Sequence, residues 1–517
     1  MQLYEKAIRE WRSLLGDQSL FVIQRNKYYS IILKPSSKKD VKQCLKIAVK
    51  HNTPLQIESQ GKNYGYTHHN ASFHTTILSL HKLNAITSFD ENLAYITVQP
   101  GVTFQQVYEY LQRQKSNLMI SMTGGPVDGS VLATTMERGI GKGRYGDRFE
   151  HFCDLEVLLP SGKIIHTGLS RFQNSVSKQV AQRGFGPVLD GLFSQSSLGI
   201  VLGMTIWLHP KPKNYSLCTF IVHRKKDLPA FINAVRILKL QGLLPGNFLL
   251  ANPYRLLCSR EQYPWKEVDN QTPLPQWKLE ELMKKHDVRG FWMGQSLVSS
   301  SDVEHDHIQR KLIEKHFNKS ICSIEWLGKK EVDSLKRSLK YFSKQLPSSI
   351  KKKINENIQV YEQTVFLGIP SGERLGSLRW RARNTSCGTG NSEQTNLSSA
   401  LWVNGVIPMS GDIVEDVVLR VSNILTMYAF EPNIGLNFVT DRVVYLIGVI
   451  LFDQTIDDES KRAIDCYHKI NTTLAQLGVY PYRLSPSGYE DMTPEKQSYK
   501  ELMTGLKKLF DPQNILR

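Results

Sequence analysis

The sequence predicts a mixed α+β fold, and three observations in its first 210 residues support this prediction. A strand–helix–strand pattern spans residues 28–58, a β-hairpin pattern spans 155–168, and glycine-rich turns separate the elements. Beyond Pro212 the pattern changes to longer helices with polar connections, so we expect a domain boundary near residues 210–216.

The first unit begins with a strand and an amphipathic helix. Residues 28–34 (YYSIILK) are strand-like, and Ser37 is a suitable N-cap for the helix that follows. Residues 54–58 (PLQIE) predict a buried strand that runs into the glycine loop 59–66, whose backbone N–H groups could face a phosphate. The apolar face expected for the helix consists of Val41, Cys44, Leu45 and Ala48.

Strands and helices then alternate to the end of the chain. In the first part we expect strands at 75–80 and 93–101, a helix at 103–114 capped by Thr103, a hairpin at 155–168, and a strand at 199–212 stopped by prolines. In the second part we expect helices at 227–240, 307–319 and 461–478, loops at 350–359 and 383–399, and a last helix before the terminal LFDPQNILR.

The composition fits a protein of two or three domains. The chain has 517 residues, of which 41% are hydrophobic and 22% charged, enough for sizeable cores. Its longest apolar stretches, such as residues 442–452, fall short of the roughly 18–20 residues of a membrane span. The first residues lack the apolar core and cleavage site of a secretory signal. We therefore expect a cytoplasmic protein with no membrane partner.

The charge distribution and the pattern of cysteines and histidines argue against a nucleic-acid-binding, disulfide-stabilised or metal-binding protein. The net charge of +17 attracts anions, but the basic residues are spread along the chain without interleaved aromatic residues, so nucleic acid is not an expected partner. Seven scattered cysteines without a C-x-x-C pair argue against a disulfide framework and a zinc site. The neighbouring histidines lack the H-E-x-x-H pattern, and we predict no metal.

The glycines around Lys142 do not form a nicotinamide-binding fingerprint. That motif, G-x-G-x-x-G, opens a helix directly after the first strand of its domain. Gly139, Gly141 and Gly143 break the spacing and lie far from the first strand–helix–strand unit. A serine hydrolase of the strand–turn–helix type is also not predicted, because the chain has no G-x-S-x-G.

Six stretches, taken together and in order, resemble the vanillyl-alcohol oxidase and 4-cresol dehydrogenase flavoproteins. The resemblance implies an α+β fold with a two-subdomain FAD-binding domain of the p-cresol methylhydroxylase (PCMH) type and an inserted α+β cap that contacts substrate. It places the FAD-binding domain at 1–213, the cap at 214–476 and a return to the FAD-binding domain at 477–517. The six stretches are ESQGKNYGY (58–66), ITVQPGVTFQQVYEYLQ (96–112), residues 129–168, residues 184–212, PYR (481–483) and LFDPQNIL (509–516).

The resemblance implies FAD as the cofactor, with the loop from Ser59 to Tyr66 around its pyrophosphate. Glycines in this loop would let backbone donors approach closely. The residues expected to contact FAD are Ser59, Gly61, Lys62, Asn63, Tyr64, Gly65, Pro100, Gly101, Val102, Gly129, Ser130, Glu137, Gly139, Ile140, Tyr145, Gly146, Ile200 and Arg483.

By the same resemblance, Tyr66, Tyr482 and Arg483 match residues that hold a substrate phenolate while hydride leaves a benzylic carbon. Ionisation of the phenol pushes electron density toward that carbon, so a charged clamp suits the step. Lys142 stands where relatives have another clamp tyrosine, and we expect its ammonium to face the substrate and bind a phenolate or a carboxylate. A lysine that extends from the turn into solvent remains the alternative.

Other departures concern the flavin itself. The residue that carries the covalent flavin bond in relatives aligns with Ala400, so we expect FAD without a covalent bond; His68 or His69 is the alternative attachment site. The acid near flavin N5 in some relatives falls close to Gly125, and Asp128 is its candidate replacement. A histidine pair of the cap is replaced near Tyr445 and Leu446. We expect retained flavin binding and a rebuilt substrate pocket.

These observations predict an FAD-dependent oxidoreductase that removes hydride from a small aromatic or conjugated substrate. Reoxidation by oxygen or by a protein electron acceptor stays open, and so does a homodimer. The positive charge favours a second possibility, a tailoring enzyme whose substrate is tethered to an acidic carrier protein. A flavin-binding protein without redox turnover is the third, although Tyr482 and Arg483 weigh against it.

Overall fold

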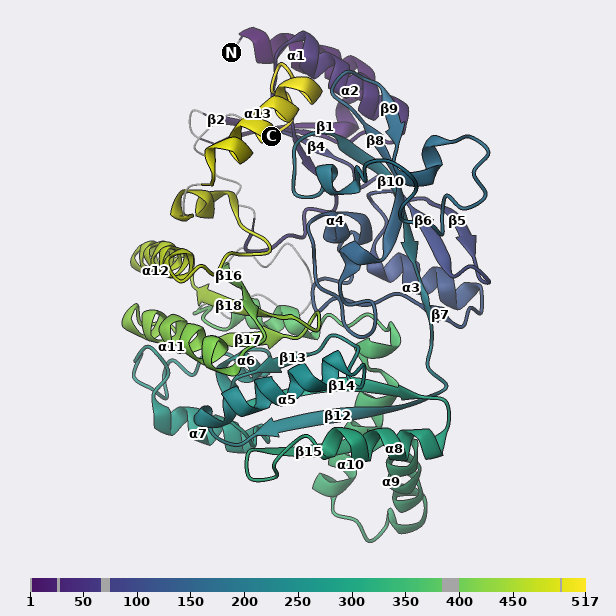
Figure 1. The fold of residues 1–517 in the computed structure, drawn as a ribbon. Helices are drawn as coiled ribbons and strands as arrows, with labels where there is room; N and C mark the ends of the chain where they lie inside the picture. The colour runs from purple at the N-terminus through teal and green to yellow at the C-terminus, as the bar shows by residue number, and fades with distance from the viewer. Residues whose placement is uncertain (1, 26–27, 67–74, 384–398, 493–494) are drawn as a thin grey trace.

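The computed structural model describes residues 2–25, 28–66, 75–383, 399–492 and 495–517. Figure 1 shows the N-terminal α+β region, in purple and blue, above a larger teal-to-green unit built on a second set of strands. The last segment, in yellow, runs back from the lower unit to the upper one, so that both chain ends lie at the top.

The first sheet contains the predicted strand–helix–strand unit. Its strand order is β1-β2-β4-β3, with β1 and β2 antiparallel and the other pairs parallel. The hydroxyl of Ser37 caps α2 by accepting from the backbone N–H of Asp40 at 3.1 Å, and the four expected apolar residues of that helix are buried. The elements are α1 (Gln2–Leu15), β1 (Leu20–Arg25), β2 (Tyr28–Leu33), α2 (Lys38–Lys50), β3 (Gln56–Glu58) and β4 (Thr75–Ser79).

The second sheet is antiparallel, with the order β5-β6-β10-β8-β9. Thr103 caps α3, as predicted, and also forms a capping box with Gln106. The predicted 155–168 hairpin is present as β8 and β9. A two-stranded sheet, β7 and β11, lies beside it. The elements are β5 (Ile86–Asp90), β6 (Tyr95–Val98), α3 (Phe104–Arg113), β7 (Leu118–Met119), α4 (Val131–Met136), β8 (Phe152–Leu158), β9 (Ile164–His166), β10 (Ile200–Trp207) and β11 (His209–Pro210).

The lower unit is built on a seven-stranded antiparallel sheet with the order β15-β12-β14-β13-β17-β18-β16. The strands are β12 (Asn214–Val222), β13 (Leu249–Ala251), β14 (Trp292–Ser300), β15 (Cys322–Gly328), β16 (Ser399–Pro408), β17 (Ile434–Asn437) and β18 (Val443–Phe452). The remaining helices are α5 (Leu228–Leu240), α6 (Pro253–Leu257), α7 (Gln276–Lys285), α8 (Val303–Glu314), α9 (Lys329–Phe342), α10 (Ser348–Glu362), α11 (Gly411–Met427), α12 (Asp457–Gln476) and α13 (Gln497–Phe510).

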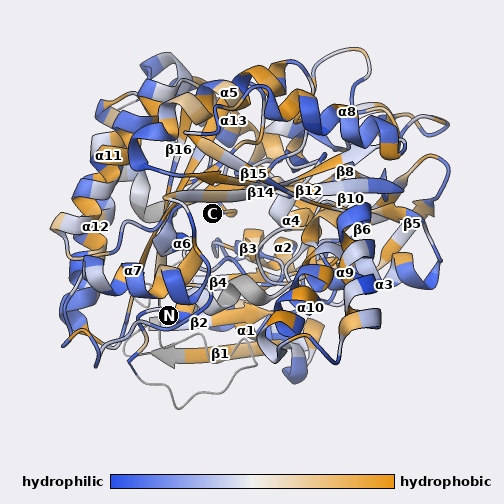
Figure 2. Cartoon of the chain, turned by 90° about the horizontal axis from the view of Figure 1, so that it is seen from below, coloured by the Kyte–Doolittle hydropathy of each residue, from blue (hydrophilic) through white to orange (hydrophobic). Residues whose placement is uncertain are grey.

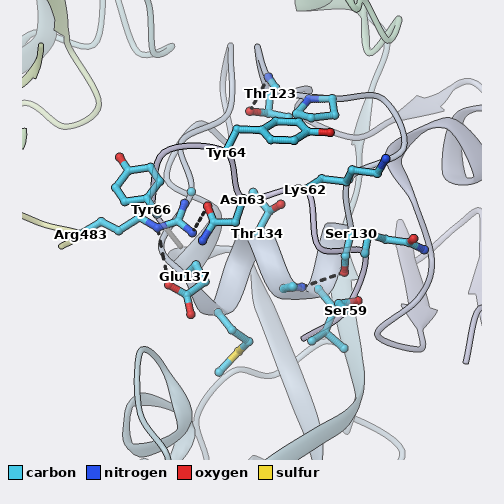
Figure 3. Close-up of a pocket in the computed structure, with 18 of the residues that line it drawn as sticks. Ser59, Lys62, Asn63, Tyr64, Tyr66, Thr123, Ser130, Thr134, Glu137 and Arg483 are labelled. Atoms are coloured by element: carbon cyan, nitrogen blue, oxygen red, sulfur yellow. Dashed lines mark hydrogen bonds and ion pairs between the residues drawn. The ribbon is translucent and has the colours of Figure 1, made fainter. Parts of the chain in front are cut away.

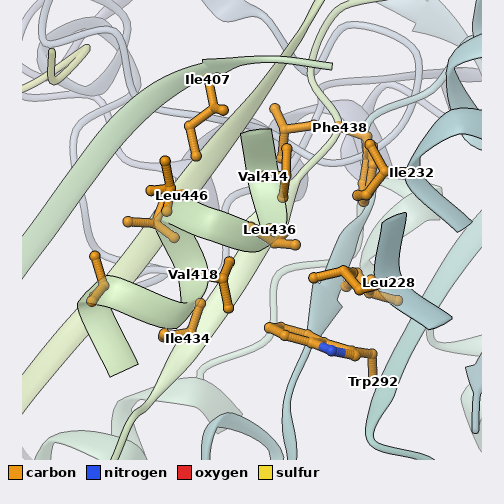
Figure 4. Close-up of a cluster of buried hydrophobic side chains, with 14 of the residues drawn as sticks. Leu228, Ile232, Trp292, Ile407, Val414, Val418, Ile434, Leu436, Phe438 and Leu446 are labelled. Carbon is orange, nitrogen blue, oxygen red and sulfur yellow. The ribbon is translucent and has the colours of Figure 1, made fainter. Parts of the chain in front are cut away.

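One face of this sheet packs against α5, α11 and α12 to form the largest hydrophobic core (Figure 4). Leu436 of β17 and Leu446 of β18 point into that core. Because side chains alternate along a strand, the neighbouring Asn437 and Ile447 point to the opposite face. That opposite face is turned toward the cavity described below.

The predicted loop at 350–359 is wrong: these residues form most of α10. The stretch is rich in lysine, asparagine and glutamine, but Ile350, Ile354, Ile358 and Tyr361 recur at helical spacing. Ile354 and Tyr361 are buried, and this narrow apolar stripe is enough to dock the helix. Of the second predicted loop, residues 384–398 lie outside the described residues.

The end of the chain returns to the first sheet. Leu516 forms a parallel bridge with Leu55, and the backbone N–H of Arg517 donates to the Leu55 carbonyl at 2.9 Å. Ile515 and Leu516 are buried in the same hydrophobic cluster as residues of α1 and α2. The division at 1–213, 214–476 and 477–517 remains a proposal, and this return supports its last segment.

The helices of the lower unit are amphipathic. Figure 2 shows hydrophilic and hydrophobic residues alternating along α8, α11 and α12. Within the described ranges, none of the helices has the length and the hydropathy that crossing a bilayer would require.

Candidate functional site

A cavity of about 480 Å³ lies between the N-terminal region and the seven-stranded sheet. This volume falls within the roughly 300–1,000 Å³ of typical small-molecule sites. Residues within the segments 56–66, 123–142 and 193–201 line one side, strands of the lower sheet line another, and Tyr482 and Arg483 come from the last segment of the chain. Part of the lining is shown in Figure 3.

The loop after β3 forms one wall of the cavity. Gly61 has a φ of 64°, a left-handed conformation that favours glycine. The hydroxyl groups of Ser59 and Ser130 both donate to the Pro100 carbonyl, the second at 2.6 Å, and so tie three segments together. Glycines bring the backbone directly to the cavity at Gly61, Gly124, Gly125, Gly129, Gly139 and Gly199.

Tyr66, Tyr482 and Arg483 meet at the cavity wall. The Arg483 guanidinium carbon lies 4.2 Å from the centroid of the Tyr66 ring, and Tyr482 precedes Arg483 in the chain and lines the same cavity. Nη2 of Arg483 donates to Asn63 Oδ1 at 2.7 Å, and its Nε lies 3.5 Å from Glu137 Oε2 (Figure 3). The guanidinium is only 12% exposed, so its charge acts in a poorly hydrated site.

Both tyrosines are proton donors at neutral pH. Burial raises the pKa of the Tyr66 phenol, against the opposing effects of Arg483 and of a hydrogen bond from Asn404. Burial also raises the pKa of the Tyr482 phenol well above its usual value. The tyrosines therefore keep their protons and can donate hydrogen bonds to an anionic oxygen.

Asn404 of β16 connects these groups to the lower sheet. Its Nδ2 donates to the Tyr66 hydroxyl at 2.8 Å and to the Arg483 carbonyl at 3.1 Å. Two residues earlier on the same face, Trp402 Nε1 donates to the Tyr64 carbonyl at 2.7 Å. The sheet thereby fixes the position of the tyrosine that the glycine loop presents.

Lys142 lies in a tight turn and lines the cavity. Its side chain is buried at 7% exposure, and Nζ donates to Asn437 Oδ1 of β17 at 3.3 Å. The backbone of Gly143 exchanges two hydrogen bonds with that of Asn247, at 3.1 and 2.8 Å, so the turn is held against the lower unit. The alternative of a lysine extended into solvent is not what the structure shows.

Arg255 is a further cation at the cavity. It lies on α6, its guanidinium donates to Asn433 Oδ1 at 3.2 Å, and it lies 5.0 Å from the centroid of the Trp402 ring. Burial lowers the pKa of the Arg255 guanidinium. Within the described ranges, no carboxylate lies within ion-pair distance of it.

The structure brings most of the predicted site residues together. The predicted residues that line the cavity are Ser59, Gly61, Lys62, Asn63, Tyr64, Tyr66, Pro100, Gly129, Ser130, Glu137, Gly139, Ile140, Lys142, Ile200, Tyr482 and Arg483. Gly65, Gly101, Val102, Tyr145 and Gly146 do not line it. The Tyr145 ring instead stacks on His151 with 4.0 Å between centroids.

Four residues were linked to flavin attachment or to the acid near flavin N5: Asp128, Ala400, His68 and His69. Asp128 is half exposed, does not line the cavity, and pairs with Lys62 at 2.9 Å. Ala400 is buried on β16. His68 and His69 lie outside the described residues.

Sequence reasoning missed the residues from the lower sheet, although two signals were available. Asn404 and Asn437 each interrupt an apolar strand, 401–407 and 434–439, and a buried polar residue in such a strand needs a partner. Arg255 lies on the five-residue helix α6, which Asn252 caps, and carries no such signal. The other missed lining residues of this unit are Leu249, Ser377, Leu378, Trp402 and Ile447.

Comparisons with known proteins give a consistent picture. Residues 29–168 match the family described as FAD binding domain. The chain is 32% identical over 532 residues to the 1'-carboxy-chondrochloren decarboxylase of Chondromyces crocatus, covering all of this chain and 96% of the relative. It is 26% identical over 537 residues to the 4-cresol dehydrogenase flavoprotein subunit of Pseudomonas putida, covering 99% and 94%.

Its fold is that of p-cresol methylhydroxylase. The crystal structure of that enzyme with substrate bound superposes with a TM-score of 0.84 at 22% identity, covering all of this chain and 96% of the other. The relative from Chondromyces extends the likeness over the full length at higher identity. The chain therefore belongs to the family of FAD-linked oxidoreductases with a PCMH-type FAD-binding domain, and FAD is its cofactor.

Proposed function

We propose that the protein oxidises a phenol by removing hydride from the carbon attached to the aromatic ring, with FAD as the acceptor. The observation that carries this proposal is the cluster of Tyr66, Tyr482 and Arg483 at the cavity wall. Two neutral phenol donors beside a guanidinium suit a phenolate oxygen better than they suit a neutral hydroxyl. The names of 4-cresol dehydrogenase and p-cresol methylhydroxylase, which refer to a phenol, support the same substrate class.

The N-terminal part of the cavity suits the cofactor. Its glycine-lined wall lets backbone N–H groups approach a pyrophosphate, and Lys62 lines the same wall. Nε of Arg483 makes no hydrogen bond among the described residues, although the Glu137 carboxylate lies 3.5 Å from it. The residues proposed to hold FAD are Ser59, Gly61, Lys62, Asn63, Tyr64, Pro100, Gly129, Ser130, Glu137, Gly139, Ile140, Ile200 and Arg483. When bound, FAD supplies a two-electron hydride acceptor.

The side chains of the cluster would act on the substrate's oxygen. Arg483 favours ionisation of the phenol, because a nearby cation stabilises the anion. Tyr66 and Tyr482 then donate hydrogen bonds to the phenolate and fix the orientation of the ring. Asn404 holds Tyr66 in place. The phenolate pushes electron density toward the ring-attached carbon, which lowers the barrier to hydride loss.

Anaerobic mixing with p-propylphenol is expected to bleach the yellow colour of the purified holoenzyme. The methyl ether p-propylanisole has nearly the same shape but cannot ionise, and it should leave the colour unchanged. Stopped-flow absorbance measures both rates. If the ether reduced the flavin as fast as the phenol, or if neither this phenol nor p-hydroxyphenylpropanoate reduced it, the phenol-oxidation proposal would be wrong.

A second reaction, oxidative decarboxylation, is favoured by the buried cation Lys142 at the cavity and by the name of the Chondromyces relative. In a p-hydroxyphenylpropanoate, hydride would leave the ring-attached carbon with its electron pair. The bond from the next carbon to the carboxylate would break, its electron pair would form the new C=C bond, and CO₂ would leave. Release of CO₂ in step with flavin bleaching would assign this reaction; bleaching without CO₂ would leave simple oxidation.

FAD is expected to be held without a covalent bond. Ala400, at the position of the attachment residue in relatives, has a methyl side chain with no nucleophilic atom. Acid precipitation of the holoenzyme should therefore leave the flavin in the supernatant, where its absorbance is measured. Colour that stays with the pellet would contradict this, and mapping the flavin-bearing peptide would then test His68 and His69.

A further inference from the structure

We infer that Lys142 and Asn437 form a carboxylate-binding subsite, and that the natural substrate carries a carboxylate at the end opposite its phenol oxygen. The inference rests on the proposed phenol oxidation and names the substrate class more closely. Both residues line the cavity, are buried, and come from different parts of the fold: a turn of the N-terminal region and strand β17.

Lys142 is buried although its place in the chain would allow it to reach solvent. A lysine in a turn could extend into solvent through its flexible side chain. Lys142 is instead 7% exposed, with its Nζ held by the amide oxygen of Asn437. Backbone pairing of Gly143 with Asn247 fixes the turn that carries it. This arrangement keeps a cation at a cavity that is large enough for a ligand.

The cavity wall formed by the seven-stranded sheet and its adjoining segments carries positive charge and no acidic residue among those described. Lining residues of the seven-stranded sheet and its adjoining segments comprise Leu249, Arg255, Ser377, Leu378, Trp402, Asn437 and Ile447. Among these described residues none is acidic, and Arg255 adds a second cation. The acidic lining residues, Glu58 and Glu137, come from the N-terminal region. An anionic substrate therefore meets excess positive charge on this side of the cavity.

The asparagines that hold Tyr66 and Lys142 lie on one face of the seven-stranded sheet. Tyr66 is held by Asn404 of β16, and Lys142 is held by Asn437 of β17. Asn404 pairs with Ile447 of β18, and Ile447 pairs with Gly435, two residues before Asn437. Strands are about 4.8 Å apart and rise about 3.3 Å per residue, so the two asparagine Cα atoms are roughly 11–12 Å apart on one face. Ile447 lies on that face between them and lines the cavity.

This layout fits a particular kind of molecule. A phenol oxygen at the Tyr66 end and a carboxylate at the Lys142 end require an aromatic ring and a short side chain between them, lying across Ile447. A hydroxyphenylalkanoate has this form. Lys142 would give its carboxylate a charge-assisted hydrogen bond, about twice as strong as a neutral one.

Binding is tested on the holoenzyme with its flavin chemically reduced, so that no ligand is consumed. Equilibrium dialysis compares p-hydroxyphenylpropanoate with p-propylphenol, which has a methyl group in place of the carboxylate. The wild type should bind the acid at least about tenfold more tightly than the phenol. Lys142→Met should abolish this preference for the acid and change the affinity for p-propylphenol less than about twofold. Lys142→Arg should keep most of the preference for the acid.

Two further measurements separate the possible failures. Lys278→Met removes another buried lysine, one whose Nζ pairs with Glu281 at 2.6 Å and which does not line the cavity; it should leave the preference intact. Phenylpropanoate, which has no phenol group, tests the subsite even if the phenol proposal fails: its binding should also depend on Lys142. Equal binding of either acid to wild type and Lys142→Met, with flavin content unchanged, would overturn the subsite.

Discussion

Replacement of Arg483 by methionine is expected to lower kcat/KM for a phenolic substrate by about 10²- to 10³-fold. This is the loss seen when one pre-organised donor to a developing oxyanion is removed, roughly 2.7–4 kcal/mol. A loss of kcat/KM of this size is expected because the Arg483 side chain is only 12% exposed and its guanidinium lies 4.2 Å from the centroid of the Tyr66 ring. Rapid mixing of the variant with substrate, at matched flavin content, measures the flavin reduction rate.

The pH profile separates an electrostatic role of Arg483 from a structural one. A cation favours the phenolate, so without it the bound phenol ionises at higher pH and the rate profile should move to alkaline pH. Arg483→Lys should recover part of the rate, because it restores the charge but not the planar fork that contacts Asn63. A methionine variant with parental rates and an unmoved profile would remove Arg483 from the proposed mechanism.

Local signals in the sequence predicted local structure well. The caps at Ser37 and Thr103 depend on contacts within three residues, and both are confirmed. The glycine loop at 59–66 was also found, because a loop that follows a strand and contains glycines is a short-range pattern. Such features need no knowledge of what packs against them.

The half of the cavity formed by the lower sheet could not be predicted in this way. Asn404 and Asn437 lie on strands that are adjacent to β18 only because of the order in which the sheet assembles. Their side chains meet Tyr66 and Lys142, which are 338 and 295 residues away in the chain. No periodicity in the sequence encodes that pairing; the polar interruption of an apolar strand is its only local trace.

Lys142 shows what a departure from a family pattern can and cannot tell. Its identity marked the position as unusual, and the resemblance predicted an ammonium that faces the substrate, with a lysine extended into solvent as the alternative. Its partner, Asn437, lies outside the six stretches that carry the resemblance, so no pattern pointed to it. The structure shows the side chain buried at the cavity, and the charge of the wall around it supports the proposed ligand.

Arg381 is the residue whose removal is expected to cost the most stability. It is 1% exposed, and Nε and Nη2 donate to the two carboxylate oxygens of Glu431 at 3.0 and 2.8 Å, while Nη1 donates to Glu459 at 2.8 Å. Burial disfavours its charge, yet the two carboxylates raise the pKa of its guanidinium above the usual range. Arg381→Met should lower the free energy of unfolding by about 3–5 kcal/mol, because it leaves the buried Glu431 carboxylate without a cation and Glu459 with only Arg383, 3.8 Å away.

Urea unfolding followed by tryptophan fluorescence measures this loss of stability. Trp380 reports on the same cluster because its Nε1 also donates to Glu431, at 3.1 Å.

Arg420→Met is the control variant. It breaks an exposed ion pair with Asp416 and should cost less than about 1 kcal/mol of stability. Removing Glu431 and Glu459 together with Arg381, by leucine substitutions, should recover much of the loss, because no uncompensated charge then remains. Because Arg381 follows the cavity-lining Leu378 by three residues, the single variant should also release flavin at lower urea than the wild type. A single variant as stable as Arg420→Met would show that the buried network does not hold this part of the lower unit together.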